Sequence, residues 1–488
     1  MSGATEGDEK GFPRHRLIGL IAGPLAAVAL LASPAPDGLS EAGWRIAAVG
    51  VWMALWWMTE ALPLAVTATL PLILFPALGV RGIETTTPAY AHPLVFLFLG
   101  GFLLARAMHV WGLDRRLALT VLRFAGSSPR NVIAGLMAVT GFLSMWVSNT
   151  ATAMVMLPIG QSIVATYAAD DATDNKVAPA LLLAIAYAAT IGGMGTIIGT
   201  PPNALFAAFM AEAYGIEISF VRWMLIGVPL VLVLLPLTWL LLTHVSFRVS
   251  GESSFETRDT IREALAALPR VSTAERLLGT VMVLVALAWI FRPLLASALP
   301  WLKLSDAGIA MTGALLLFLL PVDLARGRFL LSWQEAAAIR WDVLILFGGG
   351  LALASGIGDS DLASWIGARL TGLQVLPIFL LLLVVGLLIV FLGELASNTA
   401  MAAVFLPVAG ATAIAMGAPA IELTLPIALF ATLGFMLPVA TPPNAVIFGS
   451  GAVEIGHMLR AGIILDLVGI VVVALAILTL GAWVFGPG

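Results

Sequence analysis

Cysteine is absent from this 488-residue chain, and charged residues make up only 11% of it. The absence of cysteine excludes disulfide bonds, thiolate metal sites and a cysteine nucleophile. Soluble proteins carry about 25% charged residues, so a chain with few charges and 60% hydrophobic residues is suited to lipid rather than water. The net charge of −4 gives no indication of nucleic-acid binding.

Lysine and arginine are missing from three long segments, 131–175, 177–221 and 370–459. A multiply charged anion inside a membrane is costly unless a positive charge compensates it. Because these segments offer no basic side chain, a cation bound beside the anion is the simplest compensation. The histidines are scattered and no nucleophile lies near a base, so we expect neither an enzyme nor a cofactor other than coupling ions.

Apolar stretches recur along the chain, and a spanning helix needs about 20 apolar residues. We therefore predict an all-α polytopic membrane protein with about eleven transmembrane helices. Residues 1–16 are expected to form a cytoplasmic tail, and 17–43 the first helix and its loop. The run 17–32 also fits a signal peptide, but a further span follows directly, which favours a membrane helix.

Two short polar sequence motifs, referred to below as words, each occur twice inside apolar stretches. Ser148-Asn149-Thr150 recurs as Ser397-Asn398-Thr399, and Thr200-Pro201-Pro202-Asn203 recurs as Thr441-Pro442-Pro443-Asn444. The first word recurs after 397 − 148 = 249 residues and the second after 441 − 200 = 241. A third block, Leu97–Gly101, matches Leu346–Gly350 at the first offset. Three blocks in register predict a duplication, with repeats at 44–245 and 277–488 and a cytoplasmic linker at 246–276.

Each Ser-Asn-Thr word interrupts an apolar stretch, at 131–168 and at 376–415. These residues are favoured helix caps, so we predict that each word lies at the tip of a re-entrant hairpin. Paired prolines remove two N–H donors, so the Thr-Pro-Pro-Asn words should break their helices, with the first resuming near residue 203.

Each repeat is expected to contain five full spans, and an odd number places the second repeat upside down in the membrane. With the N-terminus in the cytoplasm, cytoplasmic segments would carry 18 of the 24 Lys and Arg residues and outer segments 6, as the positive-inside rule requires. An inverted repeat with broken helices places its substrate between the halves, near the middle of the membrane. We expect a multi-pass protein of the inner (plasma) membrane.

The four words bring helix starts, which favour anions, together with hydroxyl and carbonyl oxygens, which suit a hard cation such as sodium. These motifs resemble the divalent anion/sodium symporter (DASS) family, over essentially the whole chain after residue 40. The resemblance implies sodium-coupled symport of C4-dicarboxylates (succinate, malate, fumarate), by a homodimer with an elevator motion in the lipid bilayer.

The family's site residues transfer to matching positions here. The resemblance implies that the substrate contacts Asn149, Thr150, Asn398 and Thr399, in a site shared with Ser148, Ser397, Thr200, Pro201, Thr441 and Pro442. A first sodium site would comprise Ser144, Ser148, Asn149 and Gly199, and a second Ala396, Asn398 and Ala440. Gly393 stands where the family pattern has a threonine, so the second site is poorer in oxygen.

Several alternatives remain open. Gly393 leaves room for dicarboxylate exchange without net sodium coupling, and sulfate or citrate are rival substrates. A sodium/proton antiporter is a different class, but it would need acidic side chains at the site, and only Glu394 is near. Glu394 itself is either functional, as intramembrane carboxylates usually are, or an orienting residue for the second hairpin.

Overall fold

The computed structural model describes residues 13–126, 128–168, 176–249, 255–370 and 376–485. Most of the tail expected at 1–16 therefore lies outside the described residues, as do residues 250–254 of the linker expected at 246–276. Helices make up most of the described chain and strands very little of it, which confirms the all-α class. A two-stranded antiparallel hairpin of β1 (Pro321–Asp323) and β2 (Arg328–Phe329) follows α16, and the sequence analysis did not predict it.

Along the first half, the elements are α1 (Arg14–Ala32), α2 (Glu41–Thr59), α3 (Leu64–Thr67), α4 (Leu70–Ala77), α5 (Ile83–Thr86), η1 (Thr87–Ala91), α6 (Pro93–Val110), α7 (Leu113–Leu122), α8 (Pro129–Ser144), α9 (Asn149–Ala168), α10 (Val177–Gly193), α11 (Pro201–Tyr214), α12 (Phe220–Leu240) and the π-helical turn η2 (Leu241–Ser246).

Along the second half they are α13 (Phe255–Ala266), α14 (Thr273–Ile290), α15 (Arg292–Ala298), α16 (Asp306–Leu319), α17 (Trp333–Ala336), α18 (Trp341–Asp359), α19 (Leu362–Leu370), α20 (Ile378–Gly393), α21 (Asn398–Ala415), α22 (Ile421–Phe430), α23 (Pro442–Phe448), α24 (Ile455–Ala476), the π-helical turn η4 (Ile477–Gly481) and α25 (Ala482–Phe485).

Among the described residues, seven helical segments are at least 18 residues long and apolar enough to cross a membrane, and five more apolar helices have 10–17 residues. The short ones include α10, α20 and α22, which belong to the hairpins and broken helices around the repeated words. Short apolar helices at membrane depth are tolerated where other helices surround them, and α10 is buried along its length.

Two apolar stretches do not form continuous helices. The stretch 62–80 is split into α3 and α4, because Pro71 lies in the first turn of α4 and starts a new helix. In the stretch before the second Thr-Pro-Pro-Asn word, α22 ends at Phe430, well before the break at 441–444. Residues 431–441, which include Gly434 and Pro438, form an irregular segment.

The two hairpins form as the sequence predicts. In the first, α8 and α9 pack against each other and meet at residues 145–148; in the second, α20 and α21 meet at 394–397. Ser128 begins the first hairpin by accepting a hydrogen bond from the N–H of Asn131, with Pro129 in the first turn.

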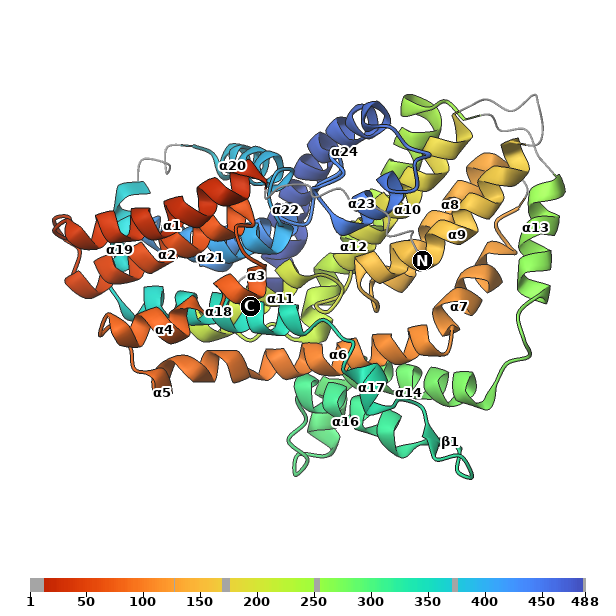
Figure 1. Cartoon of the computed structure of the whole chain (residues 1–488), viewed down its shortest axis with the longest axis horizontal. Coiled ribbons are helices and arrows are strands. Elements are labelled where there is room, and N and C mark those ends of the chain that lie inside the picture. Colours follow the sequence, from red (N-terminus) through yellow and green to blue (C-terminus); the bar gives the residue numbers. More distant parts are fainter. Residues whose placement is uncertain (1–12, 127, 169–175, 250–254, 371–375, 486–488) are drawn as a thin grey trace, which may run out of the picture.

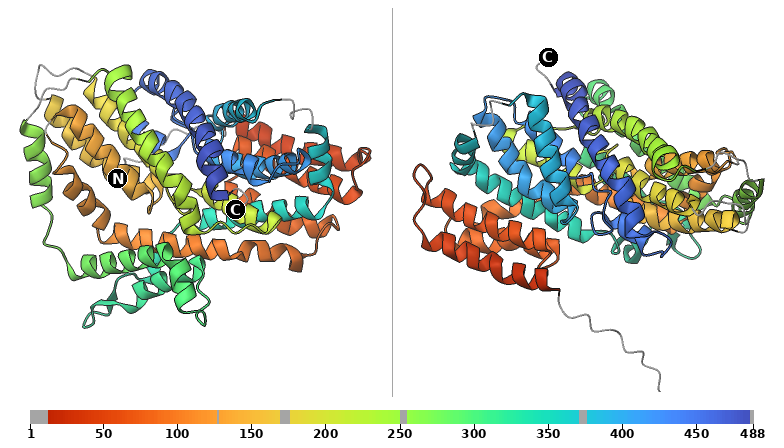
Figure 2. Two further views of the ribbon diagram at one scale, coloured as in Figure 1. Left: turned by 180° about the vertical axis from the view of Figure 1, so that it is seen from behind. Right: turned by 90° about the horizontal axis from the view of Figure 1, so that it is seen from above.

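The views in Figures 1 and 2 show how these parts are arranged. Helices α1, α2 and α4 gather at one end of the molecule, and α7, α8, α9 and α13 at the other (Figure 1). Helix α6 runs along one side between these ends and packs on α16 (Figures 1 and 2). The close α6–α16 approach depends on Gly100, since a Cβ there would lie 2.6 Å from the backbone carbon of Ala310.

Candidate functional site

All four repeated words meet at one cavity of about 490 Å³. The substrate-site residues expected from the sequence all line it: Ser148, Asn149, Thr150, Thr200, Pro201, Ser397, Asn398, Thr399, Thr441 and Pro442. The structure therefore brings together segments that are about 250 residues apart in the chain. Of the expected sodium ligands, Gly199 and Ala440 also line this cavity, whereas Ser144 and Ala396 are buried just behind the tips.

Four helices begin at the cavity: α9 at Asn149, α11 at Pro201, α21 at Asn398 and α23 at Pro442. The first turn of a helix carries N–H groups without intrahelical partners and the positive end of the helix dipole. The prolines start α11 and α23 rather than lying before them, because a first-turn residue needs no N–H. The cavity therefore favours an anion from several directions at once.

Behind the first tip, oxygen atoms cluster around Asn149. Its side-chain amide lies 2.7 Å from the Ser144 hydroxyl, and 3.2 Å from the carbonyl oxygens of Gly199 and Ala189. The Ser144 hydroxyl itself donates to Ala189 at 2.6 Å. With its oxygen turned inward, Asn149 would complete a four-oxygen cage, which is the ligand type that hard cations prefer. With its nitrogen turned inward, the same amide would satisfy these oxygens by itself.

A glycine makes this cluster compact. A Cβ on Gly193 would lie only 2.4 Å from the amide oxygen of Asn149, so no other residue fits there without displacing the amide. The helix α10 ends at Gly193. The carbonyls of its last residues therefore lie beside the hairpin tip, and that of Gly193 accepts a hydrogen bond from Asn203.

The second tip has fewer side-chain oxygens. Asn398 donates to the carbonyl of Thr432 at 3.4 Å, and its own amide oxygen is buried with no protein partner among the described residues. Gly393, the counterpart of Ser144, leaves space, since the nearest atom to a Cβ there would be the Cγ of Met401 at 4.0 Å. Here Ala396 and Ala440 could contribute only backbone carbonyls to a cation.

The asparagine of each Thr-Pro-Pro-Asn word secures the unwound segment before it, a role that the sequence analysis did not assign. The amide nitrogen of Asn203 donates to the carbonyls of Gly193 at 3.0 Å and Thr196 at 2.8 Å. Asn444 does the same with the carbonyls ten and seven residues before it, at 3.2 and 3.0 Å. Both side chains are fully buried. The sequence could have indicated this role, because an asparagine follows the Pro-Pro break in both words and a buried break needs donors for its unpaired carbonyls.

The geometry can now be set beside known proteins. The family model described as the sodium:sulfate symporter transmembrane region matches residues 14–486. A sodium-dependent dicarboxylate transporter, SdcS, of Staphylococcus saprophyticus is 40% identical over 480 residues, which cover 96% of this chain and 92% of that protein. The SdcS of Staphylococcus aureus USA300 is 40% identical over 479 residues, with the same coverage. This chain belongs to the sodium:sulfate symporter family.

Membership confirms the resemblance drawn from the repeated words, and it makes the chain a multi-pass membrane transporter rather than an enzyme. The fold also matches the crystal structure of the Alcanivorax borkumensis YdaH transporter, with a TM-score of 0.57 over 96% of each chain. Sequence identity to that protein is 13%, so this likeness concerns the fold alone.

Among the described residues, one basic side chain reaches the cavity, although the hairpin and broken-helix segments contain no Lys or Arg. Arg340, just before α18, lines the cavity together with Glu60 and Asp342. Its guanidinium donates to both carboxylate oxygens of Asp342, at 2.7 to 3.2 Å. Such a bidentate pair is already neutralised, so Arg340 offers an incoming anion little free charge.

Glu394 fits the orienting role. Its buried carboxylate accepts hydrogen bonds from the backbone N–H groups of Met436 at 2.9 Å and Leu437 at 2.8 Å. The corresponding residue of the first half is Met145, whose carbonyl accepts from the Thr196 hydroxyl. Each half of the chain therefore ties its hairpin tip to its own unwound segment, but through different groups.

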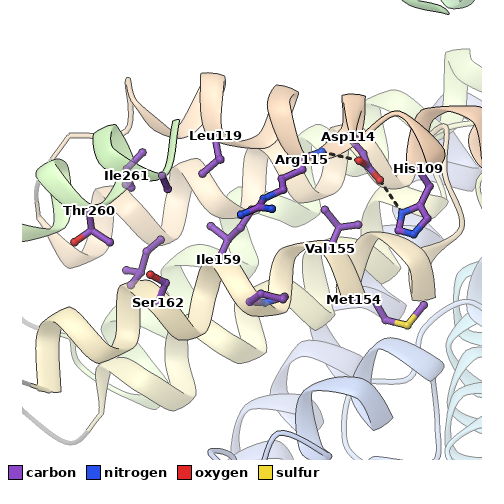
Figure 3. A pocket seen from close by; sticks show the side chains of 14 residues that line it. His109, Asp114, Arg115, Leu119, Met154, Val155, Ile159, Ser162, Thr260 and Ile261 are labelled. Atoms are coloured by element: carbon purple, nitrogen blue, oxygen red, sulfur yellow. Dashed lines mark hydrogen bonds and ion pairs between the residues drawn. The ribbon is translucent and has the colours of Figure 1, made fainter. Parts of the chain in front are cut away.

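A second cavity of about 520 Å³ lies away from the repeated words, between α7, α9 and α13 (Figure 3). Its walls are mostly apolar, including Leu119, Ile159 and Ile261, and His109 pairs with Asp114 at one end. It contains none of the repeated words, so it is not the candidate transport site.

Proposed function

We propose that this protein is a secondary active transporter that couples sodium to the uptake of C4-dicarboxylates such as succinate, malate and fumarate. The observation that carries the proposal is the meeting of both Ser-Asn-Thr words, and of four helix starts, at one cavity. The relatives named sodium-dependent dicarboxylate transporters support the same substrate class.

Two equivalent hairpin tips suit a substrate with two equivalent carboxylates. One carboxylate would bind Asn149 and Thr150 with the first N–H groups of α9, and the other Asn398 and Thr399 with those of α21. Thr200-Pro201 and Thr441-Pro442 would form the walls between them. Charge-assisted bonds to N–H and hydroxyl donors are the strong kind of hydrogen bond, so the site needs no arginine contact.

Sodium would bind behind the tips and compensate the charge of the substrate. The first ion would be held by Ser144, Ser148, Asn149 and the carbonyl of Gly199; the oxygens of Ser144, Asn149 and Gly199 lie close together with that of Ala189. The second would be held by Asn398 and the backbone of Ala396 and Ala440. Asn149 and Asn398 belong to both the ion and substrate sites, which would make binding of the anion depend on the cation.

The transport step follows the family expectation. The protein would act as a homodimer in the inner (plasma) membrane, with its N-terminus in the cytoplasm. The hairpins, broken helices and the helices after them, α12 and α24, would move together as an elevator past the rest of the chain. The proposed orientation in the membrane rests on the distribution of Lys and Arg between the segments predicted to be cytoplasmic and those predicted to be outside.

A specific observation keeps exchange as the second candidate. Gly393 brings no hydroxyl to the second ion site, although the structure has space for one. If that site stays empty, the charge of a dicarboxylate would be only partly compensated, and exchange of one dicarboxylate for another would replace net sodium-driven uptake.

The test is uptake of labelled succinate into proteoliposomes, with an inward sodium gradient or with potassium in its place. Accumulation driven by sodium, and lost in N149A and N398A variants that still purify as folded protein, supports the proposal. Uptake that ignores sodium but requires internal dicarboxylate supports exchange. Unchanged transport in both variants would refute the site, and transport of sulfate or citrate instead of succinate would refute the substrate.

A further inference from the structure

A third cavity, of about 230 Å³, lies between the substrate cavity and the cavity of Figure 3, and we call it the bridging cavity. It is lined by α6, by the tip of the first hairpin with the start of α9, and by residues 338–340 before α18. With the substrate cavity it shares Phe102, Ser148, Thr150 and Arg340. With the cavity of Figure 3 it shares His109 and Met154. The three cavities therefore form a row beside α9.

The bridging cavity differs from the substrate cavity in the charges on its wall. Among the described residues that line it, Arg106, His109 and Arg340 are basic and none is acidic. The substrate cavity instead has Glu60 and Asp342 beside Arg340. Because a concave wall of one sign attracts ions of the opposite sign, the bridging cavity favours an anion.

Two of the three basic side chains already have an acidic partner. Arg340 is bound to both carboxylate oxygens of Asp342. The Nδ1 atom of His109 lies 3.2 Å from the carboxylate of Asp114. Neither side chain therefore offers a ligand a full positive charge.

Arg106 has no acidic partner. Its Nε donates to the backbone carbonyl of Glu335 at 3.2 Å, which is a neutral acceptor. The carboxylate of Glu335 is itself bound by Arg328 and Ser332, at 2.7 Å from each. Among the described residues, the two Nη atoms of Arg106 have no hydrogen-bond partner in the protein. A half-buried guanidinium held at Nε thus keeps its outer donors free, in the fork geometry that fits a carboxylate.

The second half has no equivalent of this basic group. At the offset of 249 that relates α6 to α18, Arg106 corresponds to Ser355 (106 + 249 = 355) and His109 to Gly358 (109 + 249 = 358). The two halves are predicted to face opposite sides of the membrane. A basic wall present in one half alone belongs to one side, and the proposed orientation places it on the cytoplasmic side.

We propose that the bridging cavity is a second, weaker site for the dicarboxylate, occupied as the anion passes between the substrate cavity and the cytoplasm. This inference rests on the proposed function. Arg106 binds one carboxylate through its Nη donors, while the other carboxylate stays within reach of Thr150, which lines both cavities. The bridging cavity has about half the volume of the substrate cavity, so it takes a single small anion.

Binding in the bridging cavity should not require sodium. Of the expected ligands of the first ion, Ser148 lines this cavity, whereas Ser144, Asn149 and Gly199 do not. The positive charge comes from Arg106 instead of a bound cation. Because this side chain is half-buried and reached by water and salt, its attraction for the anion is screened, and the site is weak enough to release the substrate.

Saturation-transfer NMR of succinate with purified protein in potassium tests this site without transport. Wild type should bind succinate weakly although sodium is absent. N398A alters the substrate cavity but not the bridging cavity, so it should keep this binding. R106Q replaces the charged fork with a neutral amide, and its affinity should fall about tenfold or more because hydrogen bonds to a charged group are lost.

Two more variants separate binding from packing. R328Q loses the ion pair with Glu335 but lines none of the three cavities, so it should bind succinate as wild type does. A151L should fill the bridging cavity and abolish binding with Arg106 intact, and it decides the question if R106Q does not fold.

Absence of binding to wild type in potassium, its loss in N398A, or equal binding by wild type and A151L would overturn the proposal. None of these outcomes depends on sodium-driven uptake, whose failure would concern the proposed function alone.

Transport gives a second test, because the site lies on one side of the membrane. Intact cells expose the outer face to the medium, and inside-out membrane vesicles expose the cytoplasmic face. The uptake rate at low succinate, which reports capture of the anion, should fall about tenfold for R106Q in the vesicles and stay within about twofold of wild type in cells. R106K, which keeps the charge but not the fork, should recover part of the loss. Equal losses from both faces, or the same loss in R328Q, would overturn the proposal.

Discussion

Asn203 and Asn444 make the same two hydrogen bonds in the two halves of the molecule, each to the carbonyls ten and seven residues before it. They hold open two helix breaks that would otherwise leave buried carbonyls without donors. Thr200 and Thr441 lie at the ends of these breaks and line the cavity. The site therefore depends on two residues whose amide nitrogens bond to the backbone of the breaks.

We expect N203A and N444A each to lower the stability of the protein by about 1–3 kcal/mol, because each removes two hydrogen bonds and leaves one buried carbonyl, of Gly193 or Gly434, without its donor. Transport should fall further than stability, since the breaks shape the cavity. Thermal unfolding in detergent and sodium-driven succinate uptake check both effects. N131A, at an exposed asparagine on α8, is the control, and equal behaviour of all three variants would contradict the prediction.

The loss of the Ser144 hydroxyl should affect sodium binding before substrate binding. S144A removes one oxygen of the cluster around Asn149, so the sodium concentration for half-maximal uptake should rise about tenfold or more, a loss on the scale of one hydrogen bond to a charged group. Sodium titration of uptake at saturating succinate measures it. S162A, in the other cavity and exposed, should leave the titration unchanged. A variant that raised only the succinate requirement would place Ser144 outside the ion site.

Two glycines at the ion sites should respond oppositely to substitution. A methyl group on Gly193 would collide with Asn149 at 2.4 Å, so G193A should abolish sodium-dependent uptake. Gly393 has space, so G393A should be tolerated, and G393S should lower the sodium requirement by adding an oxygen to the second site. Sodium titrations of the three variants decide this. A G393S titration identical to that of G393A would show that no ion uses the added hydroxyl.

The hydroxyl of Tyr187 links the two halves, because it donates at 2.8 Å to the carbonyl of Phe435 in the irregular segment. In the first half the equivalent carbonyl, of Met194, is bound instead by the indole N–H of Trp223. Y187F should therefore destabilise the protein by about 1–3 kcal/mol through an unsatisfied buried carbonyl, and should also lower transport by loosening the break.

The matched control for Tyr187 is Y90F. Tyr90 donates to the carbonyl of Ala68, and neither residue belongs to a break, so its loss should reduce the unfolding temperature without a comparable loss of transport. Unfolding temperature and succinate uptake for both variants provide the comparison. If Y90F impaired uptake as strongly as Y187F, the effect would be one of general stability and not of the link between halves.

Much of this molecule followed from its sequence. The scarcity of charge determined a membrane protein, since charged groups are costly in lipid. The duplicated words located both hairpins and both breaks, because Ser-Asn-Thr caps a helix and paired prolines cannot continue one. Those are local rules, and they hold whatever the rest of the chain does.

Tertiary structure decided what local rules do not contain. The sequence did not show that α22 ends at Phe430, because the residues after it are also mostly apolar and would suit a longer helix. The break is stable because Asn444 donates hydrogen bonds to carbonyls that a helix would otherwise satisfy. The sequence did not bring Arg340 to the cavity, since the elements that line the cavity lie far apart in the chain. Such contacts depend on how helices pack in three dimensions, and there the distances between atoms, rather than their order, set the chemistry of the site.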